Sequence, residues 1–194
     1  MTESAANFDM ARRVMVVSQL RPQGVTDSFV LAAMASVPRQ DYVPAVSQAS
    51  AYGDRPLHLA DGSPMMPPAE LGLLLGRLAP RPGERALVVG GGGGYAAAIL
   101  RHIGLVVATD DEGSGAVDLI LVEGAIEYLP DHVAQRLEPD GRVGAAILED
   151  GVTRLATGRV ASGSSAANRV GFTSFAEAQV PVLPGTSSAP VFAF

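Results

Sequence analysis

Apolar residues recur with two different periods along the chain, and the period changes near residue 83. Before that point they recur every three to four residues, which is typical of amphipathic helices. After it they form short runs bounded by turn residues, which is typical of buried strands. The pattern predicts helices at 8–20, 28–36, 70–78, 95–102 and 131–137. It predicts strands at 86–89, 105–109, 117–122, 143–148, 152–160, 171–180 and 189–194.

Proline and glycine complete this outline. Two prolines predict an extended segment at 37–44, and four prolines predict a loop at 54–68. Pro139-Asp-Gly-Arg142 predicts a turn before the next strand. We therefore expect one domain, in which residues 1–82 form a helical and loop region and residues 83–194 form the core.

The order of the elements predicts an α/β fold. Strand, helix and strand alternate after residue 83, which is the pattern of a mostly parallel, Rossmann-like sheet. The later strands follow one another through turns, which predicts antiparallel C-terminal strands. Only residues 111–116 separate the second strand from the third, too few for a helix. The sheet should therefore be shortened in the middle, with the second strand at its edge and one face beside it uncovered.

Five glycines between the first strand and the following helix form a candidate binding site. Glycine lets backbone N–H groups approach a ligand closely, and a helix N-terminus favours negative charge. Candidate cofactor-binding residues are therefore Gly90, Gly92, Gly94 and Tyr95, although the run can also be a purely structural turn. Asp110 follows Gly90 by twenty residues. It stands where an acidic residue can bind ribose hydroxyls, or it belongs to a solvated acidic turn.

Glu123 follows the third predicted strand at its carboxyl end. In folds of this kind, ligands collect beyond the carboxyl ends of the parallel strands. Glu123 is therefore a candidate ligand contact, with a helix cap as the alternative reading.

The amino-acid composition excludes several kinds of partner and of catalytic group. The net charge of −6 does not favour nucleic acid or an anionic membrane as a partner. The chain has no cysteine, and all 14 basic residues are arginine, which excludes disulfides, thiolate metal sites and lysine nucleophiles. No cluster of histidines and carboxylates indicates a metal site. The first ten residues lack the apolar core of a secretory signal, and no apolar run is long enough for a membrane helix, so a cytoplasmic location is expected.

Four blocks along the chain carry a further signal. They are Gln19-Leu-Arg-Pro-Gln-Gly24, Val37-Pro-Arg-Gln-Asp-Tyr-Val-Pro44 with Ala51-Tyr-Gly-Asp54, Val89-Gly-Gly-Gly-Gly-Gly-Tyr95, and Asp118-Leu-Ile-Leu-Val-Glu-Gly-Ala125 with Leu137-Glu-Pro-Asp-Gly-Arg142. Together they resemble the protein-L-isoaspartate O-methyltransferase family. The resemblance runs from about residue 8 to the end, with one large gap in the middle.

The resemblance implies a doubly wound sheet with a reversed last strand. It implies S-adenosylmethionine as the cofactor, bound at the glycine run with Asp110 on the ribose. It also implies methylation of the free α-carboxylate that appears when Asn or Asp in an aged protein rearranges to isoaspartate. The implied partner is thus a protein or peptide with isoaspartyl residues. A carboxylate attacks a sulfonium methyl in line, so the enzyme mostly supplies position and desolvation.

Three features depart from the pattern of the family. Met66 stands where the family has a serine whose hydroxyl is implicated in catalysis, and methionine cannot donate a hydrogen bond. Ser63 is the nearby hydroxyl that could replace it, with a plain loop serine as the alternative. Val88 stands where the family has an acidic residue that helps to hold the methionine portion of the cofactor. The short middle segment leaves out a helix and strand with contacts to the adenine.

Two functions from different classes remain. The first is an S-adenosylmethionine-dependent carboxyl methyltransferase of the isoaspartate-repair type. The second is a catalytically impaired or inactive member of the family that serves as a binding module, including a homo-oligomer formed through the exposed sheet edge or face. A nicotinamide dehydrogenase is compatible with the glycine run alone, but not with the two N-terminal blocks.

Overall fold

The structure is a computed structural model that describes residues 3–60, 62–91, 94–109, 115–160 and 170–186. The helical elements in these residues are α1 (Glu3–Met15), the π-helix η1 (Val16–Leu20), α2 (Ser28–Ser36), the 3-10 helices η2 (Arg39–Tyr42) and η3 (Ala45–Ser50), α3 (Pro68–Leu78), α4 (Tyr95–Ile103) and α5 (Asp131–Ala134). The strands are β1 (Leu57–His58), β2 (Pro64–Met65), β3 (Arg85–Gly90), β4 (Val106–Thr109), β5 (Val117–Ile126), β6 (Leu137–Glu149), β7 (Val152–Val160) and β8 (Val170–Glu177).

Six strands form the main sheet, in the order β4-β3-β5-β6-β7-β8. The first four are parallel, whereas β7 and β8 are antiparallel to their neighbours. This arrangement confirms the predicted α/β fold with antiparallel C-terminal strands. It also confirms that β4, the second strand predicted from the sequence, lies at an edge. Val106 on this edge strand is 67% exposed, so apolar surface is open there as expected.

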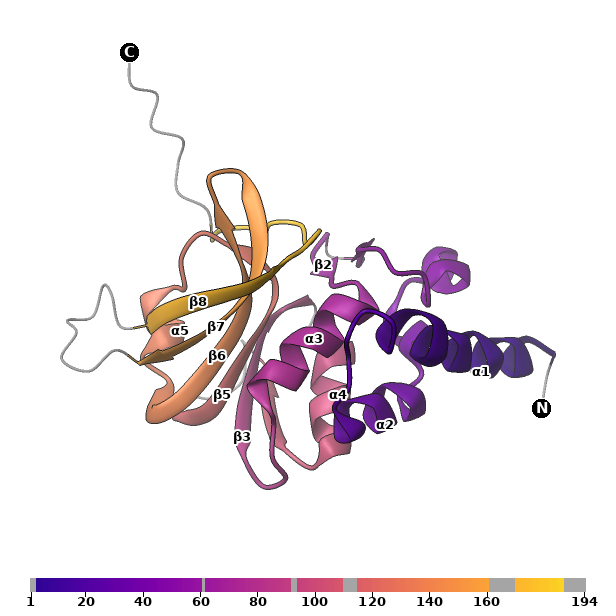
Figure 1. Cartoon of the computed structure of the whole chain (residues 1–194), viewed down its shortest axis with the longest axis horizontal. Helices are drawn as coiled ribbons and strands as arrows, with labels where there is room; N and C mark the ends of the chain where they lie inside the picture. Colours follow the sequence, from indigo (N-terminus) through magenta and orange to yellow (C-terminus); the bar gives the residue numbers. More distant parts are fainter. Residues whose placement is uncertain (1–2, 61, 92–93, 110–114, 161–169, 187–194) are drawn as a thin grey trace, which may run out of the picture.

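The helices α2, α3 and α4 pack together on one side of the sheet (Figure 1). Alternate residues of β3 point to opposite faces: Val88 joins the buried cluster on the helical side, and Leu87 joins a second buried cluster on the other side. The helical-side cluster continues into α1 and η1, so the N-terminal region and the sheet share a core. None of the described helices is long and apolar enough to cross a membrane.

Two predicted segments differ in the structure. Residues 37–44 are not extended throughout, because η2 turns the chain at Arg39, whose buried side chain donates a hydrogen bond to the carbonyl of Ala51, twelve residues further along. The predicted turn at 139–142 is also wrong, since β6 runs through it without a break. The chain bulges there instead: β6 holds three more residues than β5 between two successive pairings. Helix α5 ends before this strand begins, earlier than predicted, and the predicted strand at 189–194 lies outside the described residues.

Candidate functional site

The glycine turn lies at the carboxyl end of the parallel strands. β3 ends at Gly90, and α4 begins at Tyr95 after its N-cap residue Gly94. Gly90 and Gly91 have φ angles of +76° and +60°, in the left-handed region that favours glycine. A Cβ atom on Gly91 would lie 2.6 Å from the carboxyl carbon of Glu123. Both the backbone conformation and the close approach therefore require glycine at this turn.

A bulge in β5 sets the position of Glu123. β5 pairs with β3 as far as Glu123, which lies opposite Gly90, and it pairs with β6 as far as Leu121 and again from Ala125. Between the pairs Leu121–Gly144 and Ala125–Ala146, β5 holds two more residues than β6. Such bulges bend a strand and redirect its side chains. The side chain of Glu123 is fully buried against the glycine turn.

Arg39 and Tyr95 are buried within electrostatic reach of Glu123. The Nε atom of Arg39 donates a hydrogen bond to the carbonyl of Ala51, and Nη2 donates one to the carbonyl of Met66, both at 2.7 Å. The guanidinium carbon lies 4.8 Å from the centre of the Tyr95 ring, a cation–π contact. These contacts fix the guanidinium in one place between η2 and α4.

Several polar atoms of these three side chains have no hydrogen-bond partner in the described part of the chain. They are both carboxyl oxygens of Glu123, Nη1 of Arg39 and the hydroxyl of Tyr95. A buried polar group left without a partner costs about 1–3 kcal/mol, and more if it is charged. Such groups are rare in folded proteins and require a reason. We refer to Arg39, Tyr95 and Glu123 as the buried polar cluster.

Burial shifts the pKa of each member of the cluster. It raises the pKa of Glu123 to about 8, although the positive charge of Arg39 and the backbone N–H of Met66 oppose the shift. Burial also raises the pKa of Tyr95 and lowers that of Arg39. In the protein without a ligand, Glu123 is therefore mainly protonated at neutral pH.

The structure brings most of the predicted cofactor residues to one place. Those that it describes there are Gly90, Gly94, Tyr95 and Glu123. Gly92 and Asp110, the predicted ribose ligand, lie outside the described residues. Their roles toward a cofactor stay predictions.

The predicted catalytic residue Ser63 lies in the turn between β1 and β2, where its carbonyl accepts a hydrogen bond from the backbone of Leu59. Met66, just after β2, is fully buried and holds Arg39 through its carbonyl oxygen. Val88 is buried in the helical-side cluster and presents no charge. The catalytic role of Ser63 stays a prediction.

Two residues at the site were not identified from the sequence, namely Arg39 and Leu183. A Cβ atom on Gly90 would lie 2.6 Å from Cδ1 of Leu183. The segment that carries Leu183 runs beside β5, where Ala125 donates to the carbonyl of Pro181 and accepts from the backbone N–H of Leu183. The available signal for Arg39 is that it is the single basic residue of a proline-bounded block, Val37–Pro44. Leu183 has no comparable local signal, because its place depends on this long-range pairing.

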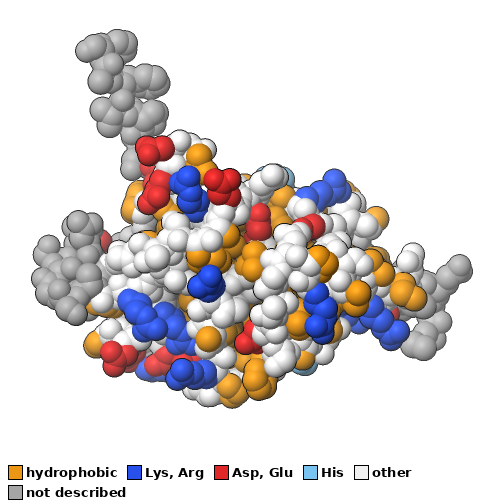
Figure 2. Space-filling model, in the orientation of Figure 1, with side chains coloured by type: hydrophobic (Ala, Val, Ile, Leu, Met, Phe, Trp, Pro, Cys, Tyr) orange, Lys and Arg blue, Asp and Glu red, His pale blue; other side chains and the backbone are white. Residues whose placement is uncertain are grey.

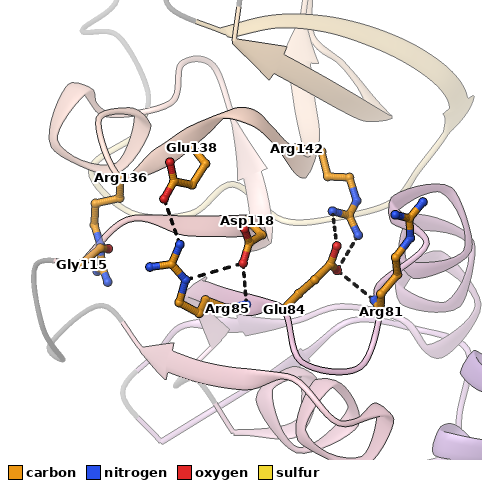
Figure 3. Close-up of polar contacts among 8 residues, drawn as sticks. All are labelled: Arg81, Glu84, Arg85, Gly115, Asp118, Arg136, Glu138 and Arg142. Carbon is orange, nitrogen blue, oxygen red and sulfur yellow. Dashed lines mark hydrogen bonds and ion pairs between the residues drawn. The ribbon is translucent and has the colours of Figure 1, made fainter.

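A second group of charged side chains lies at the opposite, amino edge of the sheet (Figure 3). Arg142 pairs with Glu84 at 2.7 Å, and Arg85 pairs with Glu138 at 2.9 Å and with Asp118 at 3.7 Å. We refer to the pairs among Glu84, Arg85, Asp118, Glu138 and Arg142 as the amino-edge ion pairs. On the face shown in Figure 2, side chains of both signs are interspersed and form no continuous basic patch.

A cavity of about 450 Å³ lies away from both groups, between the start of α2, α3 and β8. Its lining includes Gly72, Arg77 and Phe175, with the guanidinium of Arg77 stacked 4.9 Å from the ring of Phe175. It includes no member of the buried polar cluster. The glycine turn is therefore the better candidate site on chemical grounds.

A parallel sheet that contains one reversed strand, β7, and has a glycine turn at its carboxyl edge is the architecture of the class of Rossmann-like methyltransferases. A solved structure shows the same fold. It is a putative protein-L-isoaspartate O-methyltransferase from Plasmodium falciparum in complex with S-adenosyl-L-homocysteine. It matches with a TM-score of 0.69 at 18% sequence identity, over 89% of this chain and 97% of that chain.

The chain belongs to the protein-L-isoaspartate(D-aspartate) O-methyltransferase family, whose model matches residues 11–111. A protein-L-isoaspartate O-methyltransferase from Methylorubrum extorquens is 34% identical over 164 residues, which are 69% of this chain and 72% of the relative. One from Methylorubrum populi is 45% identical over 96 residues, which are 50% of this chain and 45% of the relative. Some relatives thus match over less than half of their own length.

Proposed function

We propose that this protein binds S-adenosylmethionine at the glycine turn and transfers its methyl group to the α-carboxylate of isoaspartyl residues in proteins. Membership of the family supports the reaction and the substrate class. The structural observation that carries the proposal is the buried polar cluster against the glycine turn. Carboxyl oxygens, a guanidinium nitrogen and a hydroxyl that lack partners among the described residues fit a small ligand that carries charges of both signs.

The residues at the glycine turn would have different roles in such a reaction. The bound cofactor would supply a sulfonium methyl group, which an attacking carboxylate takes in line without proton transfer. Gly90 and Gly91 allow the ligand to approach the backbone, and Leu183 covers the turn. No proton moves in this reaction. Replacement of the family's serine by Met66 therefore takes away a hydroxyl that could position the substrate, and not an essential base.

Two measurements on the full chain test this function. Calorimetry with S-adenosylhomocysteine should show binding, and radiolabelled S-adenosylmethionine should label an isoaspartyl peptide but not the same peptide with ordinary aspartate. Absence of binding at millimolar ligand would overturn the proposal. Equal labelling of the two peptides would overturn the substrate class.

A pair of glycine variants shows whether the ligand uses this turn. In Gly91→Ala the new Cβ atom meets the Glu123 carboxyl group, so cofactor binding should be lost. Gly151→Ala is the matched control, because Gly151 has a similar φ of +77° but open space around it. The control should carry the same backbone strain and bind normally. Equal binding by both variants would place the ligand elsewhere.

A binding module without catalysis is the second candidate, and two observations favour it. The family's hydroxyl position is occupied by Met66, and the edge strand β4 exposes Val106. A homo-oligomer through this edge would cover that side chain. Cofactor binding without methyl transfer, together with a dimer in light scattering, would support this candidate over the enzyme.

A further inference from the structure

Glu123 is the most exceptional member of the buried polar cluster. It is 0% exposed, and neither of its carboxyl oxygens makes a hydrogen bond of normal geometry to a described residue, although the backbone N–H of Met66 is near enough to oppose the rise in its pKa. Burial of an unpaired carboxylate is strongly unfavourable, so such a group is held neutral or is reserved for a ligand. The surroundings of Glu123 decide between these possibilities.

In the described part of the chain, the elements packed around Glu123 provide no fixed counter-ion. Arg39 of η2 is the charged group that faces it among the described residues, but Nε and Nη2 of Arg39 already bind the carbonyls of Ala51 and Met66. From α4, the hydroxyl of Tyr95 lies within electrostatic range of Glu123, and after β2 the nearby group is the backbone N–H of Met66. The ion pairs of the described chain do not include Glu123. Its carboxyl group instead faces Gly91 of the glycine turn.

We propose that Glu123 is the counter-ion for a positively charged group of the ligand that binds at the glycine turn. The inference rests on the proposed function, because S-adenosylmethionine carries two such groups, an α-ammonium and a sulfonium. On the neighbouring strand β3, Val88 is 1% exposed and offers no charge for this purpose. The bulge in β5 is the structural device that turns the carboxyl group of Glu123 toward the ligand.

This arrangement makes binding depend on pH. Because burial raises the pKa of Glu123 to about 8, the carboxyl group holds a proton at neutral pH when no ligand is bound. A cation placed against it favours the ionised form and displaces the proton. Below pH 8, binding should therefore release about one proton, and the affinity should rise about tenfold for each pH unit. The ligand then binds best under mildly alkaline conditions.

Calorimetric titrations of the full chain test the proposal. S-adenosylhomocysteine carries only the ammonium, and S-adenosylmethionine carries both cations. Each is titrated at about pH 6, 7 and 8, in two buffers of different ionisation enthalpy, which gives the number of protons released. Release with both ligands identifies the ammonium as the partner of Glu123, and release with S-adenosylmethionine alone identifies the sulfonium.

The variant Glu123→Gln supplies a neutral group of the same shape. It should release no proton, bind with an affinity that does not change with pH, and bind about 10- to 100-fold more weakly than the wild type near pH 8. Glu149→Gln is the matched control, because it makes the same substitution at the exposed end of β6. The control should keep the proton release and the Kd of the wild type.

The outcomes separate this inference from the proposed function. If the wild type binds neither ligand at millimolar concentration, the proposed function fails. If the wild type binds but releases no proton with either ligand, or if Glu123→Gln binds and releases protons as the wild type does, the role of Glu123 is wrong while the function stands. Melting curves that match the wild type near pH 6 show that both variants are folded.

Discussion

The charged side chains at the two ends of the parallel strands, the amino edge and the carboxyl edge of the sheet, differ in how they are paired. At the amino edge, the ion pairs among Glu84, Arg85, Asp118, Glu138 and Arg142 join partly exposed side chains (Figure 3). At the carboxyl edge, four polar atoms of the three enclosed side chains of the buried polar cluster lack partners among the residues that the structure describes. Paired surface charges contribute little and cost little. Unpaired buried groups are costly, and this cost is the basis for the ligand site that we propose at the carboxyl edge.

Two glutamates make the contrast specific. Burial raises the pKa of Glu84, but hydrogen bonds from Arg142 and from the backbone N–H of Arg81 outweigh it, so the pKa is lowered overall. Burial raises the pKa of Glu123 to about 8, and the opposing charge of Arg39 is too weak to restore the ordinary value. The same side chain is thus held ionised at one edge and protonated at the other.

The largest expected effect is a gain in stability in Glu123→Gln at alkaline pH. The folded pKa of about 8 exceeds the ordinary value of 4.5, so the folded protein binds one more proton than the unfolded chain between these pH values. Stability therefore falls as the pH rises through this window, by up to about 1.4 kcal/mol per unit. The variant should match the wild type near pH 5 and exceed it by on the order of 3 kcal/mol near pH 8.

Urea denaturation without ligand, at these two pH values, measures this difference. The exposed Glu149→Gln variant is the control and should follow the wild type at both. Parallel stability curves for the wild type and Glu123→Gln would mean that the carboxyl group is already ionised and partnered in the folded protein. The contrast between the two edges would then disappear.

A smaller effect of opposite sign is expected for Glu84→Gln. The variant weakens the paired hydrogen bonds to Arg142, so it should lose about 1–2 kcal/mol at neutral pH. The folded pKa of Glu84 lies below the ordinary value of 4.5, so this stabilisation is present above that value and is lost as the pH falls through the folded pKa. Urea midpoints should therefore converge below about pH 4.5. Midpoints that differ equally at neutral and acid pH would show a packing effect instead.

Much of the fold could be predicted because its signals are local. Apolar runs and turn residues marked β3, β4 and β7, and the short link after β4 placed that strand at the edge. The two wrong segments depend on tertiary contacts. η2 begins at the buried Arg39, which binds the carbonyl of Ala51, and β6 pairs with β5 on both sides of the bulge at 138–141, so neither could be recognised from local propensity.

The candidate site was predicted less completely for the same reason. Gly90 and Glu123 could be selected because each stands at the carboxyl end of a predicted strand. The burial of Glu123, and its lack of a hydrogen-bond partner among the described residues, depend on a bulge in β5 and on Arg39 from a distant block. Leu183 reaches the turn only through pairing with β5, a contact that no local pattern encodes.

The smallest expected effect is at the amino edge of the sheet, where the charged side chains are paired. Arg85→Gln removes the pairs with Asp118 and Glu138, but the Arg85 side chain is 50% exposed and solvent screens it. The variant also keeps the bond from the backbone N–H of residue 85 to Asp118. We expect a loss below about 0.5 kcal/mol that shrinks further in about 1 M salt, measured by urea midpoints. A loss above about 1 kcal/mol, unchanged by salt, would show that the amino-edge ion pairs stabilise the sheet substantially. The amino-edge ion pairs would then stabilise the folded protein, whereas the buried polar cluster at the carboxyl edge destabilises it.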